Sequence, residues 1–163
     1  MGRILNERDL VEAVRGERAE GRTIAFANGC FDVLHVGHVR YLADAKAQAD
    51  RLIVAINDDT SVRQLKGEGR PILNGADRAE MIAALESVDY VVLFPDSDVN
   101  RLLRLLKPDV HCKGTDYTPD TVPERDTVRA YGGRIAIVGD PKNHSTRDML
   151  RRICGSAPDY GSG

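Results

Sequence analysis

Short apolar runs alternate along the chain with longer stretches in which apolar residues recur every three or four positions. Runs such as 51–57 and 89–94 are almost continuously apolar, which is typical of strands covered on both faces. The spacing within 38–49 and 76–88 predicts amphipathic helices between such strands. We therefore expect an α/β fold, a Rossmann-like five-stranded parallel sheet with helices on both faces. The predicted strands are 23–27, 51–57, 89–94, 109–113 and 134–139.

Capping residues and breakers predict where other elements begin and end. An N-terminal helix should follow Asn6, and a short helix should follow Asp58 or Asp59, because these side chains are good N-caps. The glycine-rich stretch 66–75 is expected to be a loop. Further helices are predicted within 98–107, 117–133 and 145–153. We divide the chain into an N-terminal helical segment (1–21), a main domain (22–153) and a disordered tail (154–163).

The charge balance and the apolar content of the chain limit which kinds of binding partner we expect. The 163 residues carry 23 Lys and Arg against 25 Asp and Glu, a formal net charge of −2. No global basic field exists to hold nucleic acid, so a bound anion must be held by local groups. The charged N-terminus does not resemble a signal peptide, and no stretch has the apolar length of a membrane span. Cys30, Cys112 and Cys154 form no CxxC pair, and we expect a reduced, cytoplasmic protein with no membrane partner.

The stretch FANGCFDVLHVGH (26–38) carries the strongest chemical signal. It is neither a Walker A loop nor GxGxxG, yet His35 and His38 flank Gly37 where a predicted strand leads into a predicted helix. A helix N-terminus favours anions, and a glycine there lets a base or a phosphate approach the backbone. Each imidazole can donate a hydrogen bond to a phosphate oxygen. Because ligands of open parallel sheets bind beyond the carboxyl ends of strands, we expect an anion site here.

Two other interpretations of this stretch remain open. Cys30, Asp32, His35 and His38 are all possible metal ligands, which would indicate a metal hydrolase. Nothing elsewhere in the chain completes a zinc-binding spacing, so we expect no protein-bound metal site. The histidines could also be ordinary loop and helix-cap residues.

The wider sequence resembles a known family. HVGH after NGCFD resembles the HxGH signature of nucleotidyltransferases. Together with LKGEGRPI, PDVHCKGTDY and a late Ser-Thr pair, residues 22–153 resemble heptose 1-phosphate adenylyltransferases, and more weakly glycerol-3-phosphate cytidylyltransferases. The resemblance implies a sheet of the HxGH nucleotidyltransferase type. It also implies transfer of AMP from ATP to D-glycero-D-manno-heptose 1-phosphate, giving ADP-heptose and pyrophosphate. A cytidylyltransferase acting on a polyol phosphate and a non-catalytic nucleotide-binding module are the alternatives.

The resemblance also implies roles for individual residues. The implied catalytic residues are His35, His38 and Lys66. The implied nucleotide-binding residues are Asn28, Gly29, Cys30, Phe31, Gly37, His38, Lys113, Gly114, Ser145 and Thr146. The implied substrate-binding residues are Asp32, Arg78, Tyr117 and Arg147. A surface lysine is the alternative for Lys66 and a surface salt bridge for Arg78, while Arg147 stands where the family usually has threonine.

Cofactor and partners also follow from the resemblance. Mg²⁺ is expected with ATP, held mainly by phosphate and water rather than by a protein cage. A homodimer is expected. The sequence shows no sugar-kinase domain, so the sugar phosphate should come from a separate kinase.

Overall fold

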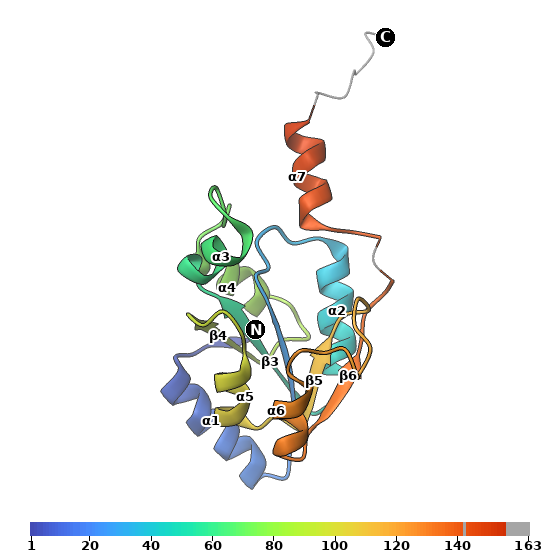
Figure 1. Cartoon of the computed structure of the whole chain (residues 1–163). Coiled ribbons are helices and arrows are strands. Elements are labelled where there is room, and N and C mark those ends of the chain that lie inside the picture. Colours follow the sequence, from blue (N-terminus) through green and yellow to red (C-terminus); the bar gives the residue numbers. More distant parts are fainter. Residues whose placement is uncertain (142, 156–163) are drawn as a thin grey trace.

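The computed structural model describes residues 1–141 and 143–155 as a sheet flanked by helices (Figure 1). All strand pairs are parallel, and the sheet order is β1-β4-β3-β2-β5-β6. The open parallel α/β fold expected from the sequence is confirmed. The strands are β1 (Arg3–Ile4), β2 (Ile24–Gly29), β3 (Arg51–Asn57), β4 (Tyr90–Phe94), β5 (Val110–Lys113) and β6 (Arg134–Ile137).

The predicted number of strands is wrong, because the sheet has six strands rather than five. The additional strand, β1, pairs with β4 at the edge of the sheet through Arg3↔Tyr90 and Ile4↔Val91. Two exposed residues are too few to show a strand period, so the local pattern carried no signal for β1. The predicted tail lies largely outside the described residues.

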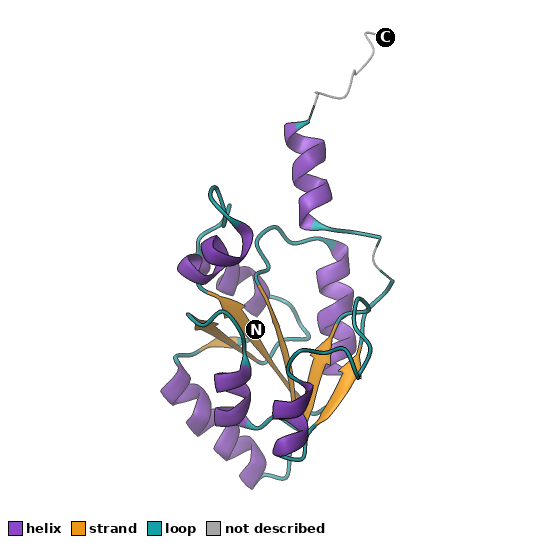
Figure 2. Cartoon of the chain, in the orientation of Figure 1, coloured by secondary structure: helices purple, strands orange, loops and turns teal. Residues whose placement is uncertain are grey.

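Helices cover both faces of the sheet (Figure 2). The helices α2 and α4 supply core residues on one face, and α1, α5 and α6 supply them on the other. In contrast, α7 projects from the body and has no buried residue (Figure 1). The helices are α1 (Glu7–Ala19), α2 (Val36–Lys46), α3 (Asp59–Lys66), α4 (Gly75–Ala83), α5 (Asn100–Leu106), α6 (Arg125–Ala130) and α7 (Thr146–Cys154).

Strand alternation divides the core into two clusters. In β2, Ala25 and Ala27 face the α2 side, whereas Ile24 and Phe26 face the α1 side, as the two-residue period of a strand requires. The expected N-caps are confirmed at Asn6 and Asp58, whose side chains accept backbone N–H bonds from Asp9 and Ser61. These caps fix where α1 and α3 begin.

The strand order creates a switch point between β2 and β5. From β2 the chain adds β3 and then β4 on one side, and it crosses to β5 on the other side. Helices that follow strands on the two sides of such a point diverge, which opens a crevice at the carboxyl ends. The motif 26–38 begins in β2 and continues into α2, at this edge of the sheet.

A buried carboxylate at Glu17 ties α1 to the sheet. Its side chain accepts hydrogen bonds from Tyr90 (2.5 Å), Arg22 (2.5 Å) and Arg51 (3.0 Å). Burial alone would raise the pKa of Glu17, but these donors lower it to about 2.

Glu17→Gln is expected to destabilise the protein at neutral pH but not in strong acid. Because the folded pKa lies below the unfolded value, the carboxylate stabilises the fold above about pH 4.5, and this contribution is lost as pH falls towards 2. Urea unfolding of both proteins at several pH values should show the free-energy gap closing over that window. Glu12→Gln, an exposed change on the same helix, is the matched control, and a gap constant with pH would contradict the assignment.

Candidate active site

The turn after β2 places an aromatic ring beneath the motif. Phe31 has a φ of +48°, a left-handed conformation that is unfavourable for residues other than glycine, and its side chain is buried. A Cβ on Gly29 would lie 3.0 Å from the Phe31 ring, so a larger residue there would press on the ring. The ring meets His38 edge-on, with 5.3 Å between ring centroids. Phe31 therefore supports His38 from the core side.

The two motif histidines form a stacked pair at the N-terminus of α2. His35 is the N-cap residue, and its ring stacks on His38 with centroids 3.9 Å apart and an interplanar angle of 22°. The backbone N–H of His35 donates to Nδ1 of His38 over 3.3 Å. This bond assigns the proton of a neutral His38 ring to Nε2, which makes that atom a hydrogen-bond donor. The pair combines imidazole donors with the positive end of a helix dipole.

The His35 ring occupies the space that a side chain at Gly37 would need. A Cβ at this position would lie 2.9 Å from two atoms of the His35 imidazole, and 3.5 Å from Cβ of His144. The His35 and His144 rings are also neighbours, with centroids 6.1 Å apart. Any larger residue at position 37 would displace the stacked pair.

Asp32 anchors the loop that follows Lys66. Its buried carboxylate accepts bonds from the backbone N–H groups of Ile72 (2.8 Å) and Leu73 (2.9 Å) and from Nε of Arg70 (2.6 Å). Burial alone would raise the pKa of Asp32, but these donors hold it below its usual value. Asp32 therefore joins the motif to the segment that follows Lys66.

Arg78 is fully buried, so the alternative of a surface salt bridge is wrong. Its guanidinium donates to the carbonyl oxygens of Cys30 and Asn57 at 2.7 Å each and of Leu73 at 3.0 Å, and it pairs with Asp59 at 2.7 Å. These bonds close the ends of β2 and β3 against α4. Every guanidinium nitrogen is bonded to a protein group, so Arg78 supports the loops of the site from within the core.

Lys66 is exposed at the C-terminal end of α3 and begins the loop that Asp32 anchors. Lys113 and Gly114 lie at the carboxyl end of β5, across the switch point. Nζ of Lys113 lies 4.9 Å from the centre of the Tyr117 ring and 3.8 Å from Oε2 of Glu124. The resemblance implied that this half-buried lysine binds nucleotide, but no local pattern links it to Glu124, eleven residues away.

The Ser145–Thr146 pair joins α7 to the motif loop. Ser145 is the N-cap, accepting the Asp148 N–H, as its position before a helix predicts. The Thr146 hydroxyl donates to the carbonyl of Val33 over 2.9 Å. Arg147 is exposed. The structure thus brings this pair against the loop that carries the histidines.

Asn28 and Cys30 lie at the carboxyl end of β2, beside the switch point. The side-chain oxygen of Asn28 is buried and has no hydrogen-bond partner among residues 1–141 and 143–155, which is unusual for a buried amide. Sγ of Cys30 lies 3.8 Å from Oδ1 of Asn57, and burial raises the pKa of its thiol. Asn28 therefore offers an unused acceptor at the switch point.

Two of the four possible metal ligands in the motif have other partners. Cys30 faces Asn57, and Asp32 is committed to the loop containing Arg70. Within the described ranges, no three His, Cys, Asp or Glu residues are grouped to hold a metal ion.

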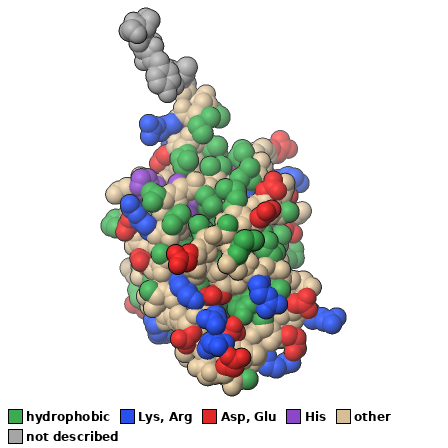
Figure 3. Space-filling view, turned by 180° about the vertical axis from the view of Figure 1, so that it is seen from behind, with side chains coloured by type: hydrophobic (Ala, Val, Ile, Leu, Met, Phe, Trp, Pro, Cys, Tyr) green, Lys and Arg blue, Asp and Glu red, His purple; other side chains and the backbone are tan. Residues whose placement is uncertain are grey.

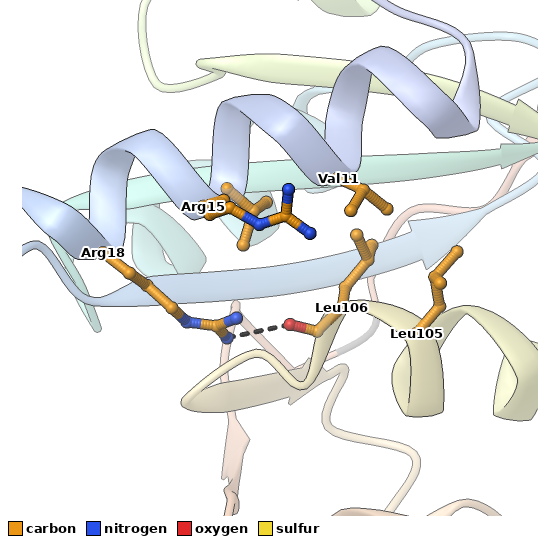
Figure 4. Close-up of a pocket in the computed structure, with 6 residues that line it drawn as sticks. Val11, Arg15, Arg18, Leu105 and Leu106 are labelled. Atoms are coloured by element: carbon orange, nitrogen blue, oxygen red, sulfur yellow. Dashed lines mark hydrogen bonds between the residues drawn. The ribbon is translucent and has the colours of Figure 1, made fainter.

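A separate hollow lies between α1 and α5 (Figure 4). Its volume is about 190 Å³, and Arg18 on its border donates to the carbonyl of Leu106 over 2.8 Å. None of the predicted site residues lines it. Its lining residues are Val11, Val14, Arg15, Arg18, Leu105 and Leu106.

The fold and the site define an open parallel α/β domain with a histidine pair at a helix N-terminus beside the switch point of the sheet. The chain belongs to the cytidylyltransferase-like family, whose model matches residues 26–152. The resemblance to HxGH nucleotidyltransferases noted in the sequence is thereby confirmed.

Individual relatives agree with this assignment. The chain is 46% identical over 151 residues to the bifunctional protein HldE of Geobacter metallireducens, covering 93% of this chain and 31% of that protein. It is 49% identical over 150 residues to HldE of Pseudomonas entomophila, covering 92% and 32%. A lipopolysaccharide core biosynthesis protein from Thermoplasma volcanium superposes with a TM-score of 0.65 at 27% identity, covering 75% of this chain and 100% of that one. The chain thus spans about a third of the length of its curated relatives.

Proposed function

We propose that this chain transfers AMP from ATP to D-glycero-D-manno-heptose 1-phosphate, giving ADP-heptose and pyrophosphate. The observation that carries the transfer reaction is the stacked His35–His38 pair at the N-terminus of α2. The choice of sugar is supported by the resemblance of residues 22–153 to heptose 1-phosphate adenylyltransferases and by the identity to the HldE proteins.

The chemistry needs alignment and positive charge more than it needs a base. The second pKa of a phosphate monoester is about 6, so the attacking oxygen is already ionised at neutral pH. Negative charge develops on the α-phosphate and on the departing pyrophosphate. Imidazole N–H groups of His35 and His38 and the helix N-terminus stabilise this charge, and the unused Asn28 oxygen accepts a hydrogen bond from a ligand.

Mg²⁺ would accompany ATP and neutralise part of the triphosphate charge. Asp32, the carboxylate in the motif, is committed to Arg70 and two backbone N–H groups, so the described residues do not form a carboxylate cradle there. We therefore assign the metal to phosphate and water ligands.

Pyrophosphate release by the purified chain tests the function directly. Heptose 1-phosphate and glycerol 3-phosphate are each combined with ATP and with CTP in the presence of Mg²⁺. Release with ATP and the heptose phosphate alone is the expected result. Release with CTP and glycerol 3-phosphate would make the chain a cytidylyltransferase, and silence in all mixtures despite ATP binding would make it a non-catalytic module.

Lys66→Ala is expected to weaken ATP binding about tenfold, the loss of one charge-assisted contact, and to leave AMP binding nearly unchanged. Lys66 heads the anchored loop, where its ammonium can contact the outer phosphates, which AMP lacks. Isothermal titration with both nucleotides measures the two affinities. Arg63→Ala, at an exposed position on the same helix, is the matched control. Equal losses for ATP and AMP would argue against contact with the outer phosphates.

We assign a homodimer to the chain in solution. Exposed apolar side chains include Val36 and Val39 on α2, Met81 on α4 and Ile153, 73% exposed, on the projecting α7. Figure 3 shows hydrophobic side chains gathered in the half of the molecule that carries the histidines. Covering them with a second copy would remove apolar surface from water. Sedimentation as a monomer at micromolar concentration would contradict this assignment.

The sugar phosphate is expected from a sugar kinase, and the cytoplasm is the expected location because ATP is the substrate. In the described residues, no helix is long and apolar enough to cross a membrane. Adenylyl transfer to free heptose would contradict the need for a kinase. Cell fractionation tests the location.

A further inference from the structure

Glu124, the residue before α6, carries a carboxylate that the reaction described above does not use. The residue is only 6% exposed, and a glutamate this deeply buried requires partners. Although Glu124 is the N-cap of α6, its side chain makes no capping hydrogen bond. It faces β5 instead.

Two side chains of β5 meet this carboxylate. Oε2 of Glu124 lies 3.4 Å from Nε2 of His111 and 3.8 Å from Nζ of Lys113. Residues 111 and 113 are two positions apart in one strand, so their side chains share a face of the sheet. The strand period therefore presents both groups to Glu124.

Charge balance makes Lys113 the more important partner. Burial lowers the pKa of His111, so a neutral ring donates Nε2–H to the carboxylate at neutral pH. The positive charge that then balances Glu124 is the Lys113 ammonium. Burial lowers the pKa of Lys113 as well, and Glu124 opposes that shift. A buried ammonium without this carboxylate would lose its proton more readily.

The position of Lys113 connects this pair to the site. β2 and β5 pair through Phe26↔His111, so Asn28 and Lys113, each two residues further on, lie level with each other at the carboxyl ends of their strands. The Tyr117 ring contacts the ammonium from the loop after β5. The ammonium is thus held by a carboxylate and an aromatic face beside the switch point.

We propose that Glu124 is a positioning residue that holds the Lys113 ammonium charged and in place to bind a phosphate group of the reactants. The inference rests on the proposed adenylyl transfer and adds to it a residue that itself touches no reactant.

Glu124→Gln tests the proposal by steady-state kinetics of the full chain with ATP and heptose 1-phosphate. The variant keeps the shape of the side chain and removes its charge. We expect kcat/KM to fall about tenfold at neutral pH, as for a lost charge-assisted contact. We also expect the alkaline limb of the pH–activity profile to shift to lower pH in the variant, because Lys113 loses its proton more readily without the carboxylate. Asp126→Asn, an equivalent change at an exposed position of α6, is the matched control. An unmoved alkaline limb would overturn the proposal.

A double-mutant cycle separates positioning from a merely structural role. Glu124→Gln should add no further loss of activity to Lys113→Met, because the group that it positions is already gone. If Glu124→Gln lowers the activity of Lys113→Met by the same factor as it lowers that of the unmodified chain, the proposal is overturned. Lys113→Arg gives an independent readout even if Glu124→Gln fails to fold. The guanidinium of arginine stays charged at alkaline pH, so the alkaline limb of the pH–activity profile should shift to higher pH or disappear. An unchanged alkaline limb would overturn the proposal.

Failure of this inference is distinguishable from failure of the proposed function. If the unmodified chain releases no pyrophosphate, adenylyl transfer itself is wrong. If it does, and Lys113→Met retains full activity, adenylyl transfer stands and the role of Glu124 is overturned.

Discussion

His38→Ala is expected to lower kcat by on the order of a hundredfold without unfolding the protein, as does the loss of a single oxyanion donor in other enzymes. The ring is partly exposed and lies above Phe31, so its removal opens little space in the core. What is lost is a donor whose Nε2 proton is assigned by the bond from the His35 backbone to Nδ1. His35→Ala should have a similar effect, because the two rings stack.

Pyrophosphate release under single-turnover conditions measures the effect on the chemical step, and thermal melting checks the fold. His38→Asn keeps a donor near the position of the imidazole and should recover part of the loss. Ala43→Ser, at an exposed position on the same helix, is the matched control. Turnover like that of the unmodified chain in both alanine variants, at unchanged melting temperature, would remove the histidines from the mechanism.

The sequence predicted the sheet well where burial imposed a pattern. β3 and β4 lie between two layers of helices, so their residues are almost all apolar. Each of these apolar runs therefore predicts a strand from its own sequence, with no knowledge of the strands that pair with it. β1 is an exposed edge strand of two residues, and its pairing with β4 depends on a partner about ninety positions away. Only the assembled sheet identifies β1 as a strand.

The candidate site shows the same division between local and distant signals. His35, Gly37 and His38 are close in sequence, so their spacing predicted a helix terminus that binds anions. The partners of Arg78 and Lys113 come from separate elements. An arginine within an amphipathic helix normally indicates an exposed position, and nothing in the sequence near Arg78 shows that three carbonyl groups converge on it.

Arg78→Met is expected to destabilise the protein by about 3–5 kcal/mol, the usual cost of removing one partner from a buried charged network. Methionine fills much of the space but donates no hydrogen bond. The carbonyl groups of Cys30, Asn57 and Leu73 would then lose the guanidinium donor. A buried acceptor left without a partner costs about 1–3 kcal/mol. Urea unfolding measures the change in the free energy of unfolding.

Arg78→Lys distinguishes the network from charge alone. Lysine keeps the positive charge and can pair with Asp59, but a single ammonium cannot reach every carbonyl that the planar guanidinium reaches. Its free energy of unfolding should therefore fall between those of Arg78→Met and the unmodified chain. Because Cys30 directly follows β2 and Asn57 ends β3, folded Arg78→Lys should also bind ATP more weakly. A loss below 1 kcal/mol in Arg78→Met would mean that the site loops are held by other contacts, and Arg78 would then have no part in shaping the site.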